Sequence, residues 1–449
     1  MNPLSSPLLT DLYQLTMLQA YFEAGMTEAA VFELFVRKLP PGRNFLVAAG
    51  LEQAVEFLEG LRFGDEELAW IRSSGLFKPE FATHLERLRF TGEVHAMPEG
   101  TVFFPNEPVL RVTAPMPEAQ LVESRLLNLV HFEVMVASKA ARSVLAAPGK
   151  LLVDFGLRRA HGGEAGLLAA RAAYLAGFSG SSVALAGPRF GVPVFGTMAH
   201  SFVQAHDSEV AAFRHFARAF PGSALLLIDT YDTVGAARKV AGIAPELARE
   251  GIVVRGVRLD SGDLGRLAHD VRAVLDDAGL QATTIFASGN LDERQVRDLV
   301  AAGAPIDGFG IGTSLVTSSD APSLDAVYKL QEYAGRPRRK RSTGKATWPG
   351  RKQVHRRTGA DGRFAGDTVA AEADPQPGAP LLEQVMAGGK RVRALPTLAA
   401  ARERAREQLA RLPERLAGLD DAPAPYPVEI AASLRTLAAE VDAATADVR

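Results

Sequence analysis

Between residues 151 and 320 the chain alternates short apolar runs with longer amphipathic stretches. The runs read LLVDFG, PVFGTM, ALLLIDT, VVRGVRLD, TTIFASG and IDGFGIGT, and segments of helical length separate them. Short apolar runs of this kind are typical of strands that are buried on both faces, as in parallel sheets covered by helices. The pattern therefore predicts an α/β unit in which helices connect parallel strands.

Polar residues stand at the C-terminal ends of these runs or just beyond them. They are Asp154, Thr197, Asp229, Arg258, Asp260, Ser288 and Thr313. In a parallel barrel the C-terminal ends of the strands converge on one mouth, where barrel enzymes place their chemistry. A doubly wound sheet gathers ligands around one switch point, so polar ends on six strands would be harder to use. The distribution favours an irregular (β/α) barrel over a doubly wound sheet.

The chain before this alternation mixes helix and strand signals. TDLYQLTMLQAYFEAG predicts a helix with Thr10 or Asp11 as the N-cap and Gly25 as the stop. Strands interrupted by Pro and Gly are expected within 31–50 and 92–115. A long amphipathic helical stretch at 117–147 then leads into the alternating region.

The C-terminal part opens with the basic stretch RPRRKRSTGKATWPGRKQVHRR at 336–357. A solvated loop, a localisation signal and an RNA-binding segment are all compatible with such a stretch. Its Trp-Pro-Gly turn favours an ordered surface segment that packs on the protein. A charged helix is expected within 397–418. We predict an N-terminal α+β domain at 1–125, an α/β barrel at 126–335 and a C-terminal basic loop and helical segment at 336–449.

Composition removes several classes of protein. The 449 residues are 47% hydrophobic, enough for a sizeable core, yet no run of about 18 uncharged apolar residues occurs. The absence of cysteine excludes disulfides, thiolate metal sites and a cysteine nucleophile. A formal net charge of −2 provides no general attraction for nucleic acid. With no secretory pattern at the N-terminus, we expect a cytoplasmic protein without membrane or nucleic-acid partners.

One local feature suggests phosphate chemistry, and one histidine stands out by its position. The chain has neither a Walker loop nor a G-x-G-x-x-G fingerprint, but GFGIGT at 308–313 places glycines at a strand end. Such glycines let backbone N–H groups approach a phosphate, although they are also common in turns. His200 follows the run PVFGTM in a similar position. An isolated histidine is more often a structural residue than a catalytic one.

Eight motifs taken together carry a resemblance to a known family. In chain order they are TDLYQLTM (10–17), DFGLRRAHG (154–162), GFSGSS (177–182), GTMAHSF (196–202), DTYDT (229–233), VRLDSGDL (257–264), GFGIGTSL (308–315) and KRSTGKATWPGRKQV (340–354). Over nearly its whole length the chain resembles the nicotinate phosphoribosyltransferases, which are type II phosphoribosyltransferases.

The resemblance implies a fold and a reaction. The fold is an irregular α/β barrel with an N-terminal α+β sandwich-like domain and a C-terminal segment, assembled as a homodimer with shared active sites. The reaction forms nicotinate mononucleotide and diphosphate from nicotinate and 5-phosphoribosyl 1-diphosphate, as part of NAD biosynthesis. ATP assists it by phosphorylating a histidine, and Mg²⁺ acts as counter-ion. Neither a tightly bound cofactor nor a protein metal site is implied.

The resemblance assigns the chemical steps to three residues. His200 matches the histidine that becomes phosphohistidine. A carboxylate on its second ring nitrogen would fix the tautomer, and Asp229 is the candidate, with a helix N-cap as its alternative role. Asp260 could bind ribose hydroxyls or the Mg²⁺ hydration shell. It could also stabilise the oxocarbenium-like transition state at C1′.

Four further residues are assigned to nicotinate. Tyr13 and Thr197 match positions that contact the pyridine ring, with Tyr13 supplied by the neighbouring subunit, unless it is only the apolar face of a helix. Arg258 offers bidentate donors, which suit a carboxylate. In the related nicotinamide enzymes an aspartate stands where this chain has Ser182. Because a carboxylate there would repel nicotinate, Ser182 favours the acid over the amide.

The phosphates and the ribose complete the set. The residues assigned to them are Arg158, Ser288, Gly289, Gly310, Gly312 and Thr313. Arg159 adjoins Arg158, and the sequence leaves open which of the two faces the site. An inactive scaffold is disfavoured because all the charged positions are present. Quinolinate phosphoribosyltransferase is a weaker match because it lacks this motif set.

Overall fold

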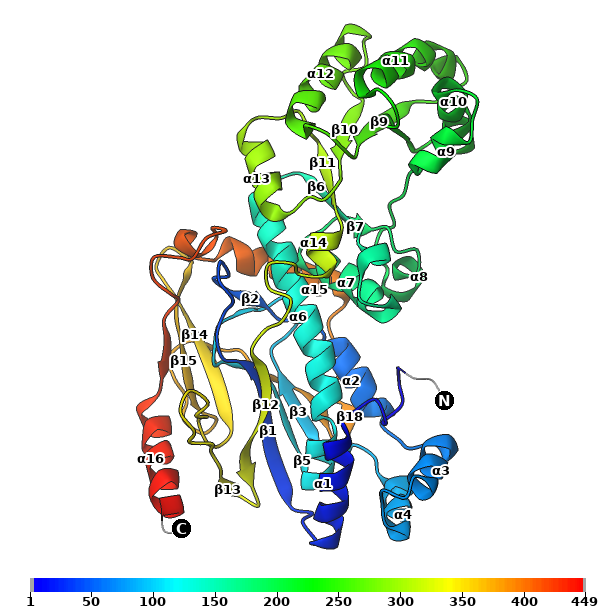
Figure 1. Cartoon of the computed structure of the whole chain (residues 1–449). Coiled ribbons are helices and arrows are strands. Elements are labelled where there is room, and N and C mark those ends of the chain that lie inside the picture. The colour runs from blue at the N-terminus through cyan, green and yellow to red at the C-terminus, as the bar shows by residue number, and fades with distance from the viewer. Residues whose placement is uncertain (1–3, 447–449) are drawn as a thin grey trace. The chain divides into compact units, whose positions relative to one another are not determined.

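The computed structural model describes residues 4–446, which group into two compact units. Unit 1 combines the chain up to residue 138 with the chain from residue 323 onward, and unit 2 is the continuous stretch 139–322. Helix α6 (Glu123–Ala146) passes from unit 1 into unit 2 (Figure 1). The C-terminal segment from residue 336 thus belongs to the same compact unit as the N-terminal residues.

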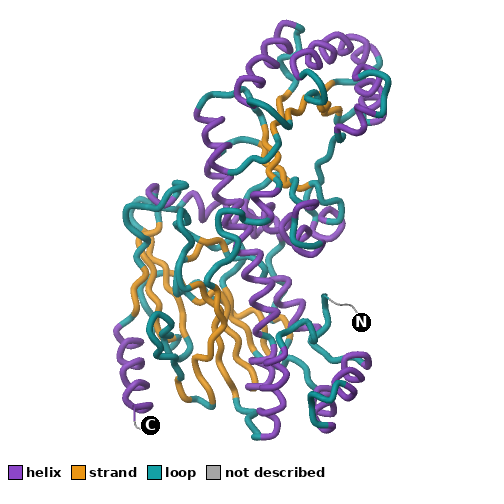
Figure 2. Tube along the Cα trace, in the orientation of Figure 1, coloured by secondary structure: helices purple, strands orange, loops and turns teal. Residues whose placement is uncertain are grey.

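Unit 2 is built on a six-stranded sheet in the order β7-β6-β11-β10-β9-β8, and every neighbouring pair is parallel. The strands are β6 (Leu151–Asp154), β7 (Gly180–Ser181), β8 (Ala224–Leu227), β9 (Val254–Leu259), β10 (Thr284–Ala287) and β11 (Gly308–Ile311). The helical elements are η1 (Leu157–Arg159), α7 (Gly163–Ala176), α8 (Ala186–Phe190), α9 (His200–Gln204), α10 (Glu209–Ala219), α11 (Thr233–Arg249), α12 (Leu264–Asp277), α13 (Glu293–Ala301) and α14 (Thr313–Val316). The strands follow a curve with helices on its outer side (Figure 2).

Five of the six apolar runs are strands, and the sixth, PVFGTM, is not. Its only pairing in the described chain is a single parallel bridge between Val194 and Ser181. Thr197 then donates its hydroxyl to the Leu225 carbonyl of β8 at 2.6 Å. Pro193 has no N–H for a ladder and Gly196 has no side chain to pack, so a regular strand is disfavoured here. The segment thus contacts β7 at one edge of the sheet and β8 at the other without forming a strand. The predicted irregular α/β barrel fold is confirmed.

Unit 1 contains three sheets within the described residues. The largest is antiparallel, in the order β13-β12-β1-β5-β3-β17-β18, and the others are β16-β14-β15-β19 and β2-β4. The strands are β1 (Ala29–Val36), β2 (Leu46–Val47), β3 (Glu93–Ala96), β4 (Val102–Phe103), β5 (Pro108–Pro115), β12 (Ala326–Tyr333), β13 (Arg336–Pro337), β14 (Lys352–Thr358), β15 (Phe364–Ala371), β16 (Ala379–Pro380), β17 (Glu383–Ala387), β18 (Lys390–Arg391) and β19 (Val428–Ile430). The helices are α1 (Leu12–Glu23), α2 (Leu51–Gly60), α3 (Asp65–Ser73), α4 (Pro79–Arg87), α5 (Met116–Leu121), α15 (Leu398–Ala410), η2 (Glu414–Leu416) and α16 (Ala432–Ala446).

The predicted N-terminal helix is confirmed as α1, with Asp11 in the N-cap position. Gly25 follows its end with φ +65°, a conformation that glycine adopts without strain. Strand β1 forms the centre of the large sheet because it pairs with β5 on one side and β12 on the other. Its Glu33 is buried and forms an ion pair with Lys352 of β14 at 2.8 Å, which ties two sheets of unit 1 together.

The basic stretch is packed as the Trp-Pro-Gly turn predicts. The guanidinium of Arg339 lies 5.8 Å from the Trp348 ring centre, and that of Arg435 from α16 lies 5.9 Å from it. Arg339 also pairs with Asp442 at 3.2 Å. Cation–π contacts on an indole ring stabilise such surface segments. Among the described residues, no helix combines the length and apolar character needed to cross a bilayer.

Candidate functional site

The C-terminal ends of β8, β9 and β10 bring four of the predicted residues together. Arg258 donates from Nε to the Ser288 hydroxyl at 3.1 Å and from Nη2 to Asp260 at 3.3 Å. The Ser288 hydroxyl also donates to Asp260 Oδ1. Asp260 N–H in turn donates to Asp229 Oδ2 at 2.9 Å. The parallel sheet thus collects these polar strand ends at one edge, as the sequence pattern predicts.

His200 is the first residue of α9 and is partly open to solvent, with 39% of its side chain exposed. Its Nδ1 lies 3.2 Å from the Thr230 hydroxyl. Its Nε2 lies 3.8 Å from Asp260 Oδ2, within ion-pair distance when the imidazole is protonated. A half-exposed imidazole between a hydroxyl and a carboxylate differs from a buried core histidine. It can accept a group from a ligand in solution.

Asp229 contacts the loop that follows β9. Its Oδ2 accepts from the Asp260 N–H and from the Ser261 hydroxyl at 2.6 Å. Its Oδ1 is buried and has no hydrogen-bond partner among residues 4–446. Helix α11 has Asp232 in the N-cap position, so Asp229 does not cap it. The neighbours of the His200 imidazole are therefore Thr230 and Asp260, while Asp229 holds the loop that carries Asp260.

Phe155 is a site residue that sequence reasoning did not single out. Its ring centre lies 5.7 Å from the Arg258 guanidinium and 5.7 Å from the Phe286 ring. A Cβ on Gly310 would come within 2.6 Å of this ring, and one on Gly312 within 2.9 Å of the Phe155 carbonyl oxygen. The two predicted glycines therefore make room for Phe155. The available signal was an aromatic residue directly after a polar strand end in LLVDFG.

Gly289, the third predicted glycine, lies in a tightly packed position. Gly289 has φ +101°, and a Cβ there would lie 1.9 Å from the Asp260 carbonyl oxygen. Only glycine therefore fits between β10 and the Asp260 loop.

The other residues assigned to phosphates lie in short helical turns. Thr313 is the first residue of the short helix α14, directly after Gly312. Arg158 and Arg159 both lie in η1 with exposed side chains, so either guanidinium is accessible to an anion.

At the ends of β6 and β7, Asp154 is fully buried. Its Oδ1 accepts from Gly156 N–H at 2.8 Å and its Oδ2 from the Ser181 hydroxyl at 2.7 Å. Ser182 follows Ser181, is partly exposed, and donates its N–H to the Asp154 carbonyl at 2.8 Å. Burial raises the pKa of the Asp154 carboxyl to about 6, although the two hydrogen bonds act in the opposite direction.

Replacing Asp154 with Asn is expected to change how stability depends on pH. Because the folded-state pKa of Asp154 lies above its ordinary value of 3.8, its favourable contribution is complete below about pH 4 and is lost as pH rises through 6. The shift corresponds to about 3 kcal/mol. The unfolding free energy of Asp154→Asn minus that of the wild type should thus rise by about 3 kcal/mol between pH 4 and pH 8. Urea unfolding at each pH measures this difference, and a constant difference would contradict it.

Tyr13 lies on α1 in unit 1, and 47% of it is exposed. Leu4, Leu9 and Leu12 are exposed to a similar extent, at 47%, 43% and 49%. Four large apolar side chains within ten residues are thus accessible to solvent. Apolar surface of this kind commonly marks a contact with another protein surface.

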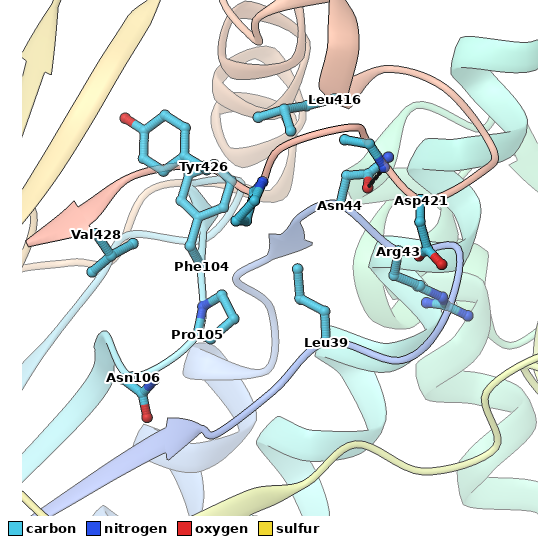
Figure 3. A pocket seen from close by; sticks show the side chains of 12 residues that line it. Leu39, Arg43, Asn44, Phe104, Pro105, Asn106, Leu416, Asp421, Tyr426 and Val428 are labelled. Atoms are coloured by element: carbon cyan, nitrogen blue, oxygen red, sulfur yellow. Dashed lines mark hydrogen bonds between the residues drawn. The ribbon is translucent and has the colours of Figure 1, made fainter.

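Unit 1 also contains a cavity of about 350 Å³ (Figure 3). Its lining includes Leu39, Asn44, Phe104, Leu416, Asp421 and Tyr426. Phe104 and Tyr426 stack with their ring centres 3.7 Å apart. Asn44 donates to the Asp420 carbonyl at 2.9 Å, and Asp421 accepts from Gly42 N–H at 2.6 Å. None of the sequence-predicted site residues lines this cavity, whose polar side chains join an N-terminal loop to the C-terminal segment.

Three family models match the chain. They describe the nicotinate phosphoribosyltransferase N-terminal domain at residues 8–131, the nicotinate phosphoribosyltransferase family at 151–342 and the corresponding C-terminal domain at 378–438. The chain is 52% identical to the Mycobacterium tuberculosis protein named nicotinate phosphoribosyltransferase pncB2, over 94% of this chain and 91% of that one. This chain belongs to the nicotinate phosphoribosyltransferase family.

Solved structures agree with this membership in the nicotinate phosphoribosyltransferase family. The crystal structure of human nicotinic acid phosphoribosyltransferase aligns with a TM-score of 0.85 and 33% identity, covering 96% of this chain and 100% of that chain. The Pyrococcus furiosus nicotinate-nucleotide pyrophosphorylase structure aligns with a TM-score of 0.74 and 26% identity, covering 91% of this chain and 96% of that chain.

Among residues 4–446, no group of three or more His, Asp or Glu side chains is arranged to hold a metal ion.

Proposed function

We propose that this protein is a nicotinate phosphoribosyltransferase that acts in NAD biosynthesis. It joins nicotinate to 5-phosphoribosyl 1-diphosphate and releases nicotinate mononucleotide and diphosphate. The observation that carries the proposal is the grouping of His200, Asp260, Arg258 and Ser288 at adjoining strand ends in a member of this family. The names of its relatives in Mycobacterium tuberculosis and human support the same activity.

We propose that ATP assists the reaction through His200. One imidazole nitrogen attacks the γ-phosphorus, the bond to the ADP oxygen breaks, and a phosphohistidine and ADP form. Water later cleaves the N–P bond and releases phosphate. The exposure of His200 and its contacts to Thr230 and Asp260 support this role, because both neighbours orient the ring and Asp260 stabilises its positive charge. Mg²⁺ enters as the counter-ion of the substrate phosphates.

In the glycosyl transfer, the nicotinate nitrogen attacks C1′ while the bond from C1′ to the diphosphate oxygen breaks. Positive charge develops on the ribose ring in such a transition state. We assign its stabilisation to the Asp260 carboxylate, which Arg258 and Ser288 hold by hydrogen bonds. Arg158, Gly312 and Thr313 are assigned to the phosphate groups. Thr197, Arg258 and Ser182 are assigned to nicotinate, and Phe155, which is partly exposed, offers an aromatic ring against which the pyridine can stack.

We further propose a homodimer in which Tyr13 of one subunit completes the site of the other. The exposed side chains around Tyr13 support an interface at this segment, since burial of such apolar surface drives association. We place the enzyme in the cytoplasm, acting on small-molecule substrates without nucleic-acid or membrane partners. A chain without cysteine is compatible with that location.

The purified protein is expected to convert nicotinate and phosphoribosyl diphosphate to nicotinate mononucleotide, and ATP with Mg²⁺ should increase turnover. The reason is the ordered motif set, together with an uncharged Ser182 that does not repel the nicotinate carboxylate. Chromatographic detection of both mononucleotides from mixed nicotinate and nicotinamide, with and without ATP, measures rate and preference together. A preference for nicotinamide would overturn the substrate assignment, and equal rates without ATP would overturn the ATP step.

A further inference from the structure

A buried chain of hydrogen bonds at the ends of β6 and β7 takes no part in the steps described above. Asp154 accepts from the Gly156 N–H with one carboxylate oxygen and from the Ser181 hydroxyl with the other, at 2.8 and 2.7 Å. The Ser181 hydroxyl oxygen accepts in turn from the Val183 N–H at 3.0 Å. Asp154 and Ser181 are both fully buried. One carboxylate thus connects two loops that leave neighbouring strands.

The hydrogen bond from the Gly156 N–H to Asp154, called here the first arm, holds the loop after β6. Gly156 lies between Phe155 and η1, the turn that contains Arg158. A Cβ on Gly156 would come within 2.0 Å of the Val316 side chain, so the backbone packs closely at this point. The bond to Asp154 therefore sets the direction in which the chain proceeds toward the exposed arginines.

The second arm holds the turn that contains Ser182. The Ser182 N–H bonds to the Asp154 carbonyl, the Ser181 side chain bonds to the Asp154 carboxylate, and the Val183 N–H bonds to the Ser181 hydroxyl. Three consecutive residues are thereby fixed to Asp154 directly or through one atom. The Ser182 side chain, which lies between them, is still partly exposed.

A purely structural role would explain this arrangement poorly. The hydrogen bonds to the Asp154 side chain come from two neutral donors, and among residues 4–446 no ion pair to a cation compensates its charge. A buried carboxylate without a cation lowers stability, and a neutral side chain of similar shape would be less costly. Groups retained against stability in this way are typical of functional sites.

We propose that Asp154 is a positioning residue with two separable effects on substrate recognition. Through Ser181 it positions Ser182 to contact the carboxylate of nicotinate. Through Gly156 it positions the loop that contains Arg158 to contact the phosphate-bearing substrate. The inference rests on the proposed function, because it assigns nicotinate to one arm and phosphoribosyl diphosphate to the other. Cutting one arm should therefore affect one substrate only.

Steady-state kinetics of Ser181→Ala test the second arm, with Ser179→Ala as the matched control. Ser179 lies on the same approach to β7, is partly exposed and does not belong to the chain of bonds. We expect Ser181→Ala to raise KM for nicotinate roughly tenfold, the loss of about 1.4 kcal/mol of binding. Its kcat and its KM for phosphoribosyl diphosphate should stay within about twofold of wild type. Because the nicotinate KM rises, the ratio of kcat/KM for nicotinate to kcat/KM for nicotinamide should fall.

Two variants of Asp154 test the complete arrangement. Asp154→Ala removes both arms and should raise KM for both substrates. Asp154→Asn can still accept from Gly156 and can donate to the Ser181 hydroxyl oxygen, which has two lone pairs. Its KM values should therefore lie closer to those of the wild type than the KM values of Asp154→Ala do. Thermal unfolding of each variant serves as the control for folding.

The outcomes separate this inference from the function on which it rests. If the wild type turns over nicotinate but Ser181→Ala behaves like Ser179→Ala, or changes both KM values alike, the positioning role is overturned and the function stands. Equal KM values for Asp154→Asn and Asp154→Ala would overturn the role of the hydrogen bonds. A wild type that makes no nicotinate mononucleotide would overturn the function and this inference together.

Discussion

Replacing His200 with Ala is expected to abolish the stimulation of turnover by ATP and leave the protein folded. The imidazole is half exposed, and among residues 4–446 its two nitrogens contact Thr230 and Asp260, so its removal takes away the proposed phosphoryl acceptor without opening a core cavity. The rate ratio with and without ATP should fall to one. Without phosphoryl transfer, no free energy from ATP reaches the glycosyl transfer step.

The phosphorylated residue itself provides the decisive measurement. Incubation with ATP and Mg²⁺ should add one phosphoryl group to His200, labile in acid and stable in base, as a phosphoramidate is. His269→Ala is the matched control, because His269 is exposed on α12 of the same unit and should retain both label and stimulation. Phosphate on another residue, or full ATP stimulation in His200→Ala, would return His200 to a structural role.

Mixing two impaired variants is expected to restore ATP-stimulated activity if Tyr13 acts across the dimer. A heterodimer of Tyr13→Ala and His200→Ala subunits has one site with both defects and one site with neither. Random pairing of equal amounts makes half of the dimers heterodimers, so about a quarter of the wild-type sites should reappear. A ring-stacking contact adds roughly 0.5–1.5 kcal/mol beyond burial, so Tyr13→Phe, which keeps the ring, should keep most of the activity.

The control for this experiment is proof that heterodimers form. Subunits with different affinity tags, refolded together and purified through both tags, isolate the mixed dimer. Its specific activity should approach half that of the wild type, because one of its two sites is intact. If Tyr13 acts within its own subunit, each site carries one defect and the purified heterodimer stays as impaired as its parent variants.

Local patterns predicted the parallel strands and the first helix because those elements depend on burial and capping within a short window. The run PVFGTM failed as a strand because Pro193 and Gly196 oppose a ladder, and its contacts to Ser181 and Leu225 come from distant parts of the sheet. The pairing of β1 with β12 left no signal in either segment. Partners separated by hundreds of residues cannot be inferred from periodicity alone.

The sequence predicted which side chains lie close together in the site, but not which of their atoms form hydrogen bonds. Polar residues at strand ends share one edge of a parallel sheet, so Arg258, Asp260 and Ser288 could be grouped in advance. The neighbours of His200 depend on loop geometry and on the rotamer of the ring, which sequence does not specify. Phe155 escaped notice because an aromatic residue in an apolar run is usually part of the core.

The order of synthesis follows from the interrupted course of unit 1. The ribosome releases β1 and β5 first, then the whole of 139–322, and only afterwards the β12 strand at 326–333 that covers the second edge of β1. Unit 2 is continuous, so it can fold while the tail is still being made. During that interval β1, in which seven of eight residues are buried in the finished sheet, presents an unpaired edge. Nascent chains of this protein therefore pass through a stage in which this strand edge is open to pairing with another chain.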